Sequence, residues 1–266
     1  MIPTHPLDAY TGPIRTRMGA AIGGERAVFR GYDLHRDLRD IHWVELLFFG
    51  VTGKRYSPSE IRICNALLTF TSYPDPRIWN NRIAALGGTS RTTGNLAVAA
   101  AQAASEAVLF GGQSFYRALD FLFRARAHCD TGGDLHGFVA DDLRRHRAIA
   151  GFGRPRINED ERVAPMLALL AEEGFDDGPF LRLARRIEEI LLTGRWRYRM
   201  NYAGLAAAVC GDLGLTPEQY SLVSFPAFPC GMFPCYLEAR EKPAGAVMPV
   251  TCVAMKYIGA SPRHWA

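Results

Sequence analysis

The chain has 266 residues, of which 31 are Lys or Arg and 27 are Asp or Glu, so its formal net charge is +4. Hydrophobic residues make up 48% and charged residues 22% of the sequence, a balance typical of folded globular proteins and unlike that of disordered chains. A net charge of +4 is too small for a protein that binds a phosphate backbone without a concentrated basic patch, so we expect no nucleic-acid partner. The length suits one large or two modest domains.

Helical periodicity dominates the sequence after a short N-terminal segment. Gly23–Tyr32 is typical of a β-hairpin or loop, and alternating strand patterns are nearly absent elsewhere. Ser57 precedes Glu60 by three residues, the spacing of a helix-start capping box. Helices are predicted over residues 40–50, 57–68, 78–86, 95–109, 114–128, 138–149, 162–173, 179–192, 202–213 and 217–241. The predicted fold class is all-α.

Two of these helices have unusual compositions. The segment 95–109 is rich in alanine, which favours close packing against neighbouring helices in a core or at a subunit interface. The uncharged stretch Tyr220–Leu237 contains three prolines, which would interrupt a membrane helix repeatedly. We therefore interpret it as a broken, buried helix and expect no membrane association.

The cysteines and the N-terminus indicate a reducing compartment. The six cysteines form no Cys-x-x-Cys pair and follow no zinc-ligand spacing, so we expect free thiols and no metal site. The residues that follow Met1 lack the basic-then-apolar layout of a secretory signal. Both observations predict a cytoplasmic protein.

Several motifs, in order, resemble those of the citrate synthase superfamily, particularly its short citryl-CoA lyase-like members. The matching segments are Arg30-Gly-Tyr-Asp33, Trp43-Val-Glu-Leu-Leu-Phe-Phe-Gly50, Gly151-Phe-Gly-Arg-Pro155, Met200-Asn-Tyr-Ala-Gly204, Asp212-Leu-Gly-Leu215, Leu237-Glu-Ala-Arg-Glu241 and Tyr257-Ile-Gly259. Each motif alone is weak, and their order and spacing make the match specific. The resemblance covers the chain from about position 20 to the end.

The resemblance implies a citrate synthase-like architecture, with a large helical domain, a small helical domain and an active site in the cleft between them. We expect residues 1–110 and 205–266 to form the large domain and residues 111–204 the small domain. The family also implies a homodimer and a small-molecule substrate. Its members use two histidines and one aspartate to enolise an acyl-CoA and to join it to, or cleave it from, a keto acid.

All three of these catalytic positions are changed in this chain. Phe110 aligns with the histidine of the family's HGG turn, Arg154 with the histidine of its GFGHP loop, and Ala203 with the aspartate of its NxDG motif. The adjacent Asn201 is retained, and the resemblance gives it a role in holding the backbone. Neither citrate synthesis nor citryl-CoA cleavage by the usual mechanism is therefore expected.

Three further positions bear on ligand binding. Phe228 aligns with an arginine that grips the keto acid carboxylate in the family, and Asn158 aligns with a lysine of the GFGHPxxK run. The second change leaves coenzyme A binding an open question, so we assign no cofactor, although a coenzyme A thioester remains an option. Arg162 matches the arginine of the family's DPR run.

These replacements predict a cleft that is more apolar than in the family. We expect Phe110, Ala203 and Phe228, with Tyr202, Phe225, Phe233 and Tyr236 from neighbouring turns, to line it, together with Asn201 and Arg162. A guanidinium is no base at neutral pH, but it binds carboxylates and stabilises oxyanions, so Arg154 is the candidate catalytic residue. The alternative is that Arg154 is one surface arginine among many.

Two other polar groups have competing interpretations. Asp75, Arg77, Asn80 and Asn81 either line the cleft or, as we favour, cap the following helix. His136 could substitute for a lost histidine, but we favour a solvated loop position.

Two functions of different classes follow. The first is a divergent enzyme of specialised metabolism that forms, cleaves or rearranges a carbon–carbon bond in a largely apolar substrate with an acidic or acyl group. The second is a non-catalytic homologue that acts as a ligand-binding or regulatory subunit, and the loss of every acid–base group of the triad favours it.

Overall fold

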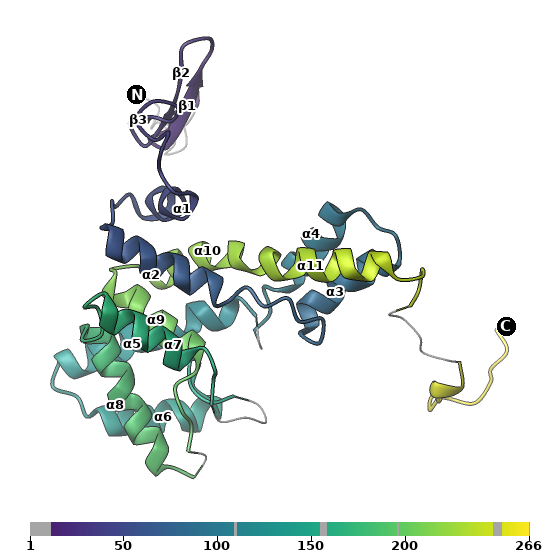
Figure 1. Ribbon diagram of the computed structural model, residues 1–266. Helices are drawn as coiled ribbons and strands as arrows, with labels where there is room; N and C mark the ends of the chain where they lie inside the picture. Colours follow the sequence, from purple (N-terminus) through teal and green to yellow (C-terminus); the bar gives the residue numbers. More distant parts are fainter. Residues whose placement is uncertain (1–11, 109–110, 155–158, 196, 247–251, 266) are drawn as a thin grey trace, which may run out of the picture.

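The structure, a computed structural model, describes residues 12–108, 111–154, 159–195, 197–246 and 252–265. Helices make up most of the described chain, and strands occur only near its start (Figure 1). The all-α prediction is therefore confirmed. Within the described residues, no helix is both long enough and apolar enough to cross a bilayer.

A small antiparallel sheet stands at the N-terminal end. It consists of β1 (Gly19–Ile22), β2 (Arg26–Phe29) and β3 (Tyr32–Asp33), and Gly19 pairs with Phe29. The predicted hairpin is present, although its turn falls at residues 23–25, so that β1 precedes the predicted segment. Arg30 donates to the carbonyl oxygen of Gly50 at 2.9 and 2.8 Å and thereby ties the sheet to helix α1 (Trp43–Thr52).

The capping box at Ser57 forms as predicted. The Ser57 side chain accepts from the Glu60 N–H, and the Glu60 carboxylate accepts from the Ser57 N–H at 2.7 Å, so helix α2 (Pro58–Thr69) begins there. Its buried face, which includes Ile63 and Cys64, joins the main hydrophobic core.

That main core unites α1 and α2 with most of the later helices. They are α5 (Gln113–Asp130), α6 (Leu135–His146), α7 (Val163–Glu172), α8 (Pro179–Thr193), α9 (Tyr202–Asp212) and α10 (Pro217–Ser224). Helix α9 is its centre, since almost every residue of Tyr202–Gly211 is buried. This helix spans the predicted domain boundary at 204/205 and packs against α5 and α8.

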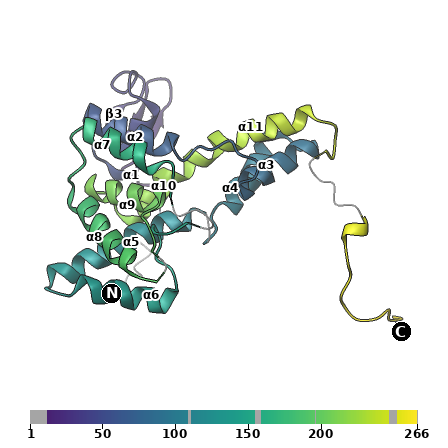
Figure 2. The same ribbon diagram turned by 60° about the horizontal axis from the view of Figure 1, so that its bottom comes forward.

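Three further helices form an arm that extends away from this core in both views (Figures 1 and 2). They are α3 (Trp79–Thr89), α4 (Gly94–Ala104) and α11 (Phe228–Glu241). Small residues let them approach closely: a Cβ at Gly88 would lie 2.4 Å from the Tyr236 carbonyl oxygen. The predicted close packing of the alanine-rich helix is also observed, since a Cβ at Gly87 of α3 would lie 2.3 Å from the Cβ of Ala97 in α4, but α4 ends at Ala104, five residues before the predicted end.

The predicted break in the helix over 217–241 is confirmed at one place, but the repeated interruption and full burial expected for Tyr220–Leu237 are wrong, because Pro234 lies inside α11 and Phe233 and Leu237 are exposed. After α10, a 3₁₀ turn at Phe225–Ala227 separates it from α11. Pro226 lies in this turn, and Pro229 lies in the first turn of α11, where a missing N–H costs nothing. The start of α11, at Phe228, lies against the cavity described below, and the segment 252–265 beyond α11 lies apart from the core (Figure 2).

Candidate functional site

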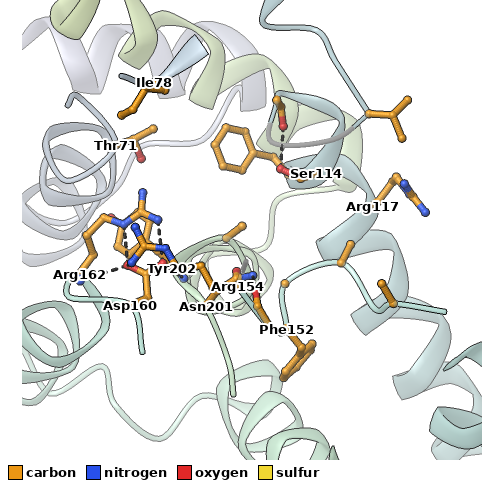
Figure 3. A pocket seen from close by; sticks show the side chains of 18 of the residues that line it. Thr71, Ile78, Ser114, Arg117, Phe152, Arg154, Asp160, Arg162, Asn201 and Tyr202 are labelled. Carbon is orange, nitrogen blue, oxygen red and sulfur yellow. Dashed lines mark hydrogen bonds and ion pairs between the residues drawn. The ribbon is translucent and has the colours of Figure 1, made fainter. Parts of the chain in front are cut away.

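A cavity of about 820 Å³ opens between the main core and the base of the arm. Six segments supply most of its lining: residues 71–81 before and within α3, the start of α5, the loop 148–154, the pair Asp160 and Arg162, the start of α9 and the start of α11 (Figure 3). Of the six predicted site residues, Arg154, Arg162, Asn201, Ala203 and Phe228 all line this cavity. Phe110 lies outside the described residues, as does Asn158.

Two glycines shape the loop that carries Arg154. Gly151 has φ +90° and Gly153 has φ +79°, a left-handed backbone that favours glycine. Gly151 also lies against helix α9, where a Cβ on Gly204 would approach its carbonyl oxygen to 2.2 Å. The loop therefore follows the surface of α9 at backbone contact.

Asn201 fastens the same loop to the start of α9. Its Nδ2 donates to the Gly153 carbonyl oxygen at 2.7 Å, and its Oδ1 accepts from the Gly204 N–H at 3.2 Å. The Asn201 N–H donates to the Gly151 carbonyl oxygen at 3.0 Å. One residue thus caps the helix and positions the backbone on both sides of Phe152.

The Arg154 side chain is bound within the chain. Its Nη1 and Nη2 both contact the carboxylate of Glu161, Nη1 donates to the Glu159 carbonyl oxygen at 3.3 Å, and the Asp160 carboxylate lies 3.8 Å away. The Arg154 hydrogen bond lowers the pKa of Glu161 to about 2. At neutral pH the pair is therefore fully ionised.

Tyr73 completes this group from the segment before α3. Its hydroxyl donates to Glu161 Oε1 at 2.8 Å. Burial and this hydrogen bond to a carboxylate raise the pKa of Tyr73 to about 12. Tyr73 therefore stays protonated and acts in the cavity as a hydrogen-bond donor.

A second, more deeply buried ion pair lies beside the first. Arg162 donates to both oxygens of Asp160, at 2.8 and 2.7 Å, and the Tyr202 N–H donates to Asp160 Oδ2 at 3.0 Å. Burial alone would raise the pKa of Asp160, but the Arg162 guanidinium and the Tyr202 N–H outweigh it and lower the pKa. The Arg162 guanidinium also lies over the rings of Tyr73 and Tyr202, at 5.3 and 4.7 Å from their centroids.

The opposite wall is aromatic. Phe228, at the start of α11, stacks on Phe115 of α5 with ring centroids 5.8 Å apart and an interplanar angle of 16°. Ala203 adds only a methyl group to the neighbouring surface. The expected aromatic lining is partly wrong, because the cavity is lined by Tyr202 but not by Phe225, Phe233 or Tyr236. Helix α11 turns the last two away, so that Phe233 is exposed and Tyr236 packs against α3 and α4.

The polar group before α3 does not cap that helix. The N-cap residue is Ile78, which provides no side-chain hydrogen bond. Asn80 and Asn81 lie inside α3, where Asn80 donates to Ser105 at 3.0 Å and Asn81 donates to the Asp75 carbonyl oxygen at 3.1 Å. Arg77, Asn80 and Asn81 line the cavity, so the interpretation that we had favoured for them is wrong.

Sequence reasoning missed several residues of the site. Its polar end includes Tyr73, Glu161 and Asp160. These residues interact with Arg154 and Arg162, and no regular sequence spacing predicts that interaction. Arg117 of α5 and His146 at the end of α6 also line the cavity, and in the described part of the chain neither has an ion-pair partner. His136, in contrast, is exposed as expected and does not line the cavity, but it lies in the first turn of α6 and not in a loop.

No arrangement of three or more His, Cys, Asp or Glu side chains suited to a metal ion occurs among the described residues. The polar end of the site instead consists of two ion pairs, one phenol and one amide. Such groups can bind an anion, donate hydrogen bonds to an oxygen that gains charge and orient a ligand. The aromatic wall can bury an apolar ligand body.

No protein-family model and no curated protein sequence matches the chain. Solved structures, however, match it over most of its length. A citryl-CoA lyase from Hydrogenobacter thermophilus superposes with a TM-score of 0.82 at 17% identity, and the match covers 95% of this chain and 97% of that one.

Two longer proteins share the same fold. An ATP citrate lyase from Methanosaeta concilii, solved with (3S)-citryl-CoA, gives a TM-score of 0.75 at 16% identity. The match covers 98% of this chain but only 45% of the longer ATP citrate lyase chain. A citrate synthase from Thermotoga maritima gives a TM-score of 0.64 at 17% identity, with 84% of this chain and 59% of that one covered. The chain therefore has the fold of the citrate synthase superfamily, as its motifs predicted.

Proposed function

We propose that this protein is a divergent enzyme that forms, cleaves or rearranges a carbon–carbon bond in a largely apolar substrate carrying an acidic or acyl group. The observation that carries this proposal is the cavity itself. It sets the stacked pair Phe115 and Phe228 opposite the guanidinium of Arg154. The solved proteins with this fold are named as lyases and synthases of citrate and citryl-CoA.

The residues at the polar end supply binding and charge stabilisation. Arg154 binds the acidic group or stabilises an oxyanion, since a guanidinium does both without losing its proton. Arg162, held by Asp160 and by two aromatic rings, keeps this end of the cavity rigid and lines it. Asn201 positions the loop that carries Arg154.

The apolar wall selects the body of the substrate. At the aromatic wall, Phe228 and Ala203 offer no charge to a second carboxylate, and a buried dicarboxylate needs paired charges. A substrate with a single acidic or thioester end and an apolar body fits both parts of the cavity, because the acidic or thioester end can bind at the polar end and the apolar body against the aromatic wall.

Native mass spectrometry tests this proposal directly. The purified protein is offered a panel of acyl-CoA thioesters and aromatic or aliphatic carboxylic acids, and bound species are then assayed for conversion. Arg154→Ala and Phe228→Arg should each lower turnover of the identified substrate at least tenfold. Unchanged turnover in both variants would show that this cavity is not the active site.

The alternative is a non-catalytic subunit that binds a ligand or regulates a partner. The observation that favours it is the state of the two arginines, because Arg154 and Arg162 are each neutralised by a carboxylate of the same loop. Under this alternative the panel would yield a bound ligand that is released without any change of mass.

We propose in addition that the protein is a homodimer. Large apolar side chains are exposed on the arm and on the segment beyond it, where a second copy would bury them. They are Leu96, Phe233, Leu237, Val253, Met255 and Ile258, with 44–94% of each residue exposed.

A further inference from the structure

Arg154 contacts the Glu161 carboxylate in the way that an arginine contacts the carboxylate of a bound ligand. The Glu161 carboxylate accepts hydrogen bonds from both terminal nitrogens of Arg154 and from the hydroxyl of Tyr73. Both donors line the cavity, whereas Glu161 reaches them from the segment leading into α7. Two guanidinium N–H groups and one phenol O–H directed at the same carboxylate make a complete carboxylate-binding arrangement.

Glu161 is the accessible member of this group. Its side chain is 59% exposed, whereas that of the neighbouring Asp160 is only 2% exposed. Although Arg154 and Tyr73 both bond to it, the Glu161 carboxylate regains water when it separates from them. Release of Glu161 therefore costs much less than release of the buried Asp160 would.

The two pairs together define what can replace Glu161. Arg162 binds the buried Asp160 carboxylate through Nε and Nη2, one edge of its guanidinium, and stays paired with it, so of these two arginines Arg154 is the one that can exchange its partner. A single carboxylate placed where Glu161 now lies would receive the same Arg154 and Tyr73 hydrogen bonds. A second carboxylate at this end would meet Asp160, which lies 3.8 Å from Arg154.

Both partners of the exchangeable pair also depart from the motifs that the chain otherwise matches. Arg154 replaces the histidine of the GFGHP loop, and Glu161 lies between Asp160 and Arg162, where the DPR run has proline. Two departures seven residues apart thus meet in one contact.

We propose that Arg154 and Tyr73 form a carboxylate-binding subsite, that Glu161 fills it in the free protein, and that the carboxylate of an otherwise apolar monocarboxylic acid displaces Glu161. This inference rests on the proposed function, which places the acidic group of the substrate at Arg154. Under this proposal Glu161 lowers the apparent affinity for every acid ligand, because each ligand must compete with Glu161 for the subsite.

Chemical labelling of arginine tests the occupancy of the subsite without knowledge of the substrate. Phenylglyoxal condenses with accessible guanidinium groups, and mass spectrometry gives the labelling rate of each arginine. Glu161→Gln should raise the rate at Arg154 about threefold or more, because the charged partner is lost. Glu172→Gln is the matched control: Glu172 is similarly exposed at 62% and pairs with Arg62, remote from the cavity. An equal Arg154 rate in the wild type and Glu161→Gln would overturn the inference.

Ligand binding separates this inference from the proposed function. The probe is 3-phenylpropanoate, compared with the neutral 3-phenylpropanamide, and calorimetry measures both. Glu161→Gln should tighten binding of the acid about two- to fivefold, the range expected for loss of one exposed ion pair, and leave the amide unchanged. Tyr73→Phe should weaken binding of the acid.

The Arg154→Ala variant decides which idea fails. Acid binding that is unaffected by Arg154→Ala would contradict the proposed role of Arg154, and with it this inference. Acid binding that depends on Arg154 but is equal in the wild type, Glu161→Gln and Tyr73→Phe would overturn the inference alone. Thermal melting of each variant establishes that it is folded.

Discussion

At the scale of single residues, the site contains two arginines with different roles. Arg154 pairs with an exposed carboxylate, and Arg162 pairs with a buried one. The buried pair has an additional partner in the Tyr202 N–H, so that Asp160 links the segment before α7 to the first turn of α9. Its loss should affect the whole fold, whereas loss of the exposed pair should affect ligand binding.

The stability of the buried pair is open to measurement. Arg162→Met should destabilise the protein by about 3–5 kcal/mol, because it leaves the Asp160 carboxylate buried with only Arg154, at 3.8 Å, as a positively charged neighbour. Chemical denaturation of the wild type and the variant gives this difference. The comparison with Arg154→Met is decisive, since the latter should cost no more than about 1 kcal/mol. Equal losses in the two variants would mean that burial does not distinguish the pairs.

The same pair gives the protein a defined response to acid. The pKa of Asp160 is lower in the folded chain than in the unfolded chain, so the ionised form stabilises the fold. This contribution is complete above the unfolded-state pKa, about 3.9, and is lost as the pH falls through the lower folded-state value. Denaturation between pH 6 and pH 3 should show a decline below about pH 4 in the wild type that is reduced in Asp160→Asn. An unchanged slope in Asp160→Asn would assign the acid sensitivity to other carboxylates.

At the scale of elements, the sequence predicted those starts and breaks that depend on local chemistry. Ser57 and Glu60 mark the start of α2 because both partners of the capping box lie within one turn. The prolines after Ser224 mark the break before α11 for the same local reason. The end of α4 was predicted wrongly: its cap residue Ser105 bonds to Asn80 of α3, and this long-range contact has no sequence pattern.

The same distinction applies to the candidate site. The family motifs selected five residues that line one cavity, because motif order constrains which segments meet. They did not reveal Glu161 or Tyr73, since side-chain pairing across a loop depends on the path of the backbone. That path depends on the positive φ angles of Gly151 and Gly153, which cannot be derived from amino-acid composition or hydrophobic periodicity.

The contact of the Arg154 loop with α9 predicts how sensitive the site is to a single methyl group. A Cβ in Gly204→Ala would lie 2.2 Å from the Gly151 carbonyl oxygen, and backbone cannot move aside as a side chain can. We expect a destabilisation of about 1–3 kcal/mol and weaker binding of any ligand that depends on Arg154. Gly112→Ala is the control, because its Cβ would lie 3.3 Å from the end of the Glu106 side chain and no closer than 3.5 Å to backbone, at the Ser105 carbonyl oxygen. Its unfolding free energy should change by less than about 0.5 kcal/mol.

At the scale of the whole molecule, the core and the arm have different surfaces. The core buries an apolar cluster that involves most of the helices, whereas the cluster in the arm is small and built largely of alanine, with Met232 and Tyr236. The cavity lies where the two meet, and Phe228 of α11 packs against both clusters. A change in how the arm is held would therefore reach the aromatic wall of the site.

The proposed homodimer predicts that the arm is held by a second copy of the chain. Leu237 lies on α11 and is 57% exposed, and a charge there would be buried without a partner in the dimer. Leu237→Asp should therefore shift the protein from twice the mass of the chain towards a single copy in light scattering coupled to gel filtration. Ile22→Asp is the control, since Ile22 is 39% exposed on the N-terminal sheet, away from the arm. A wild-type protein of single-chain mass would contradict the homodimer. If the dimer also steadies Phe228, Leu237→Asp should weaken binding of apolar ligands in the cavity although residue 237 does not line it.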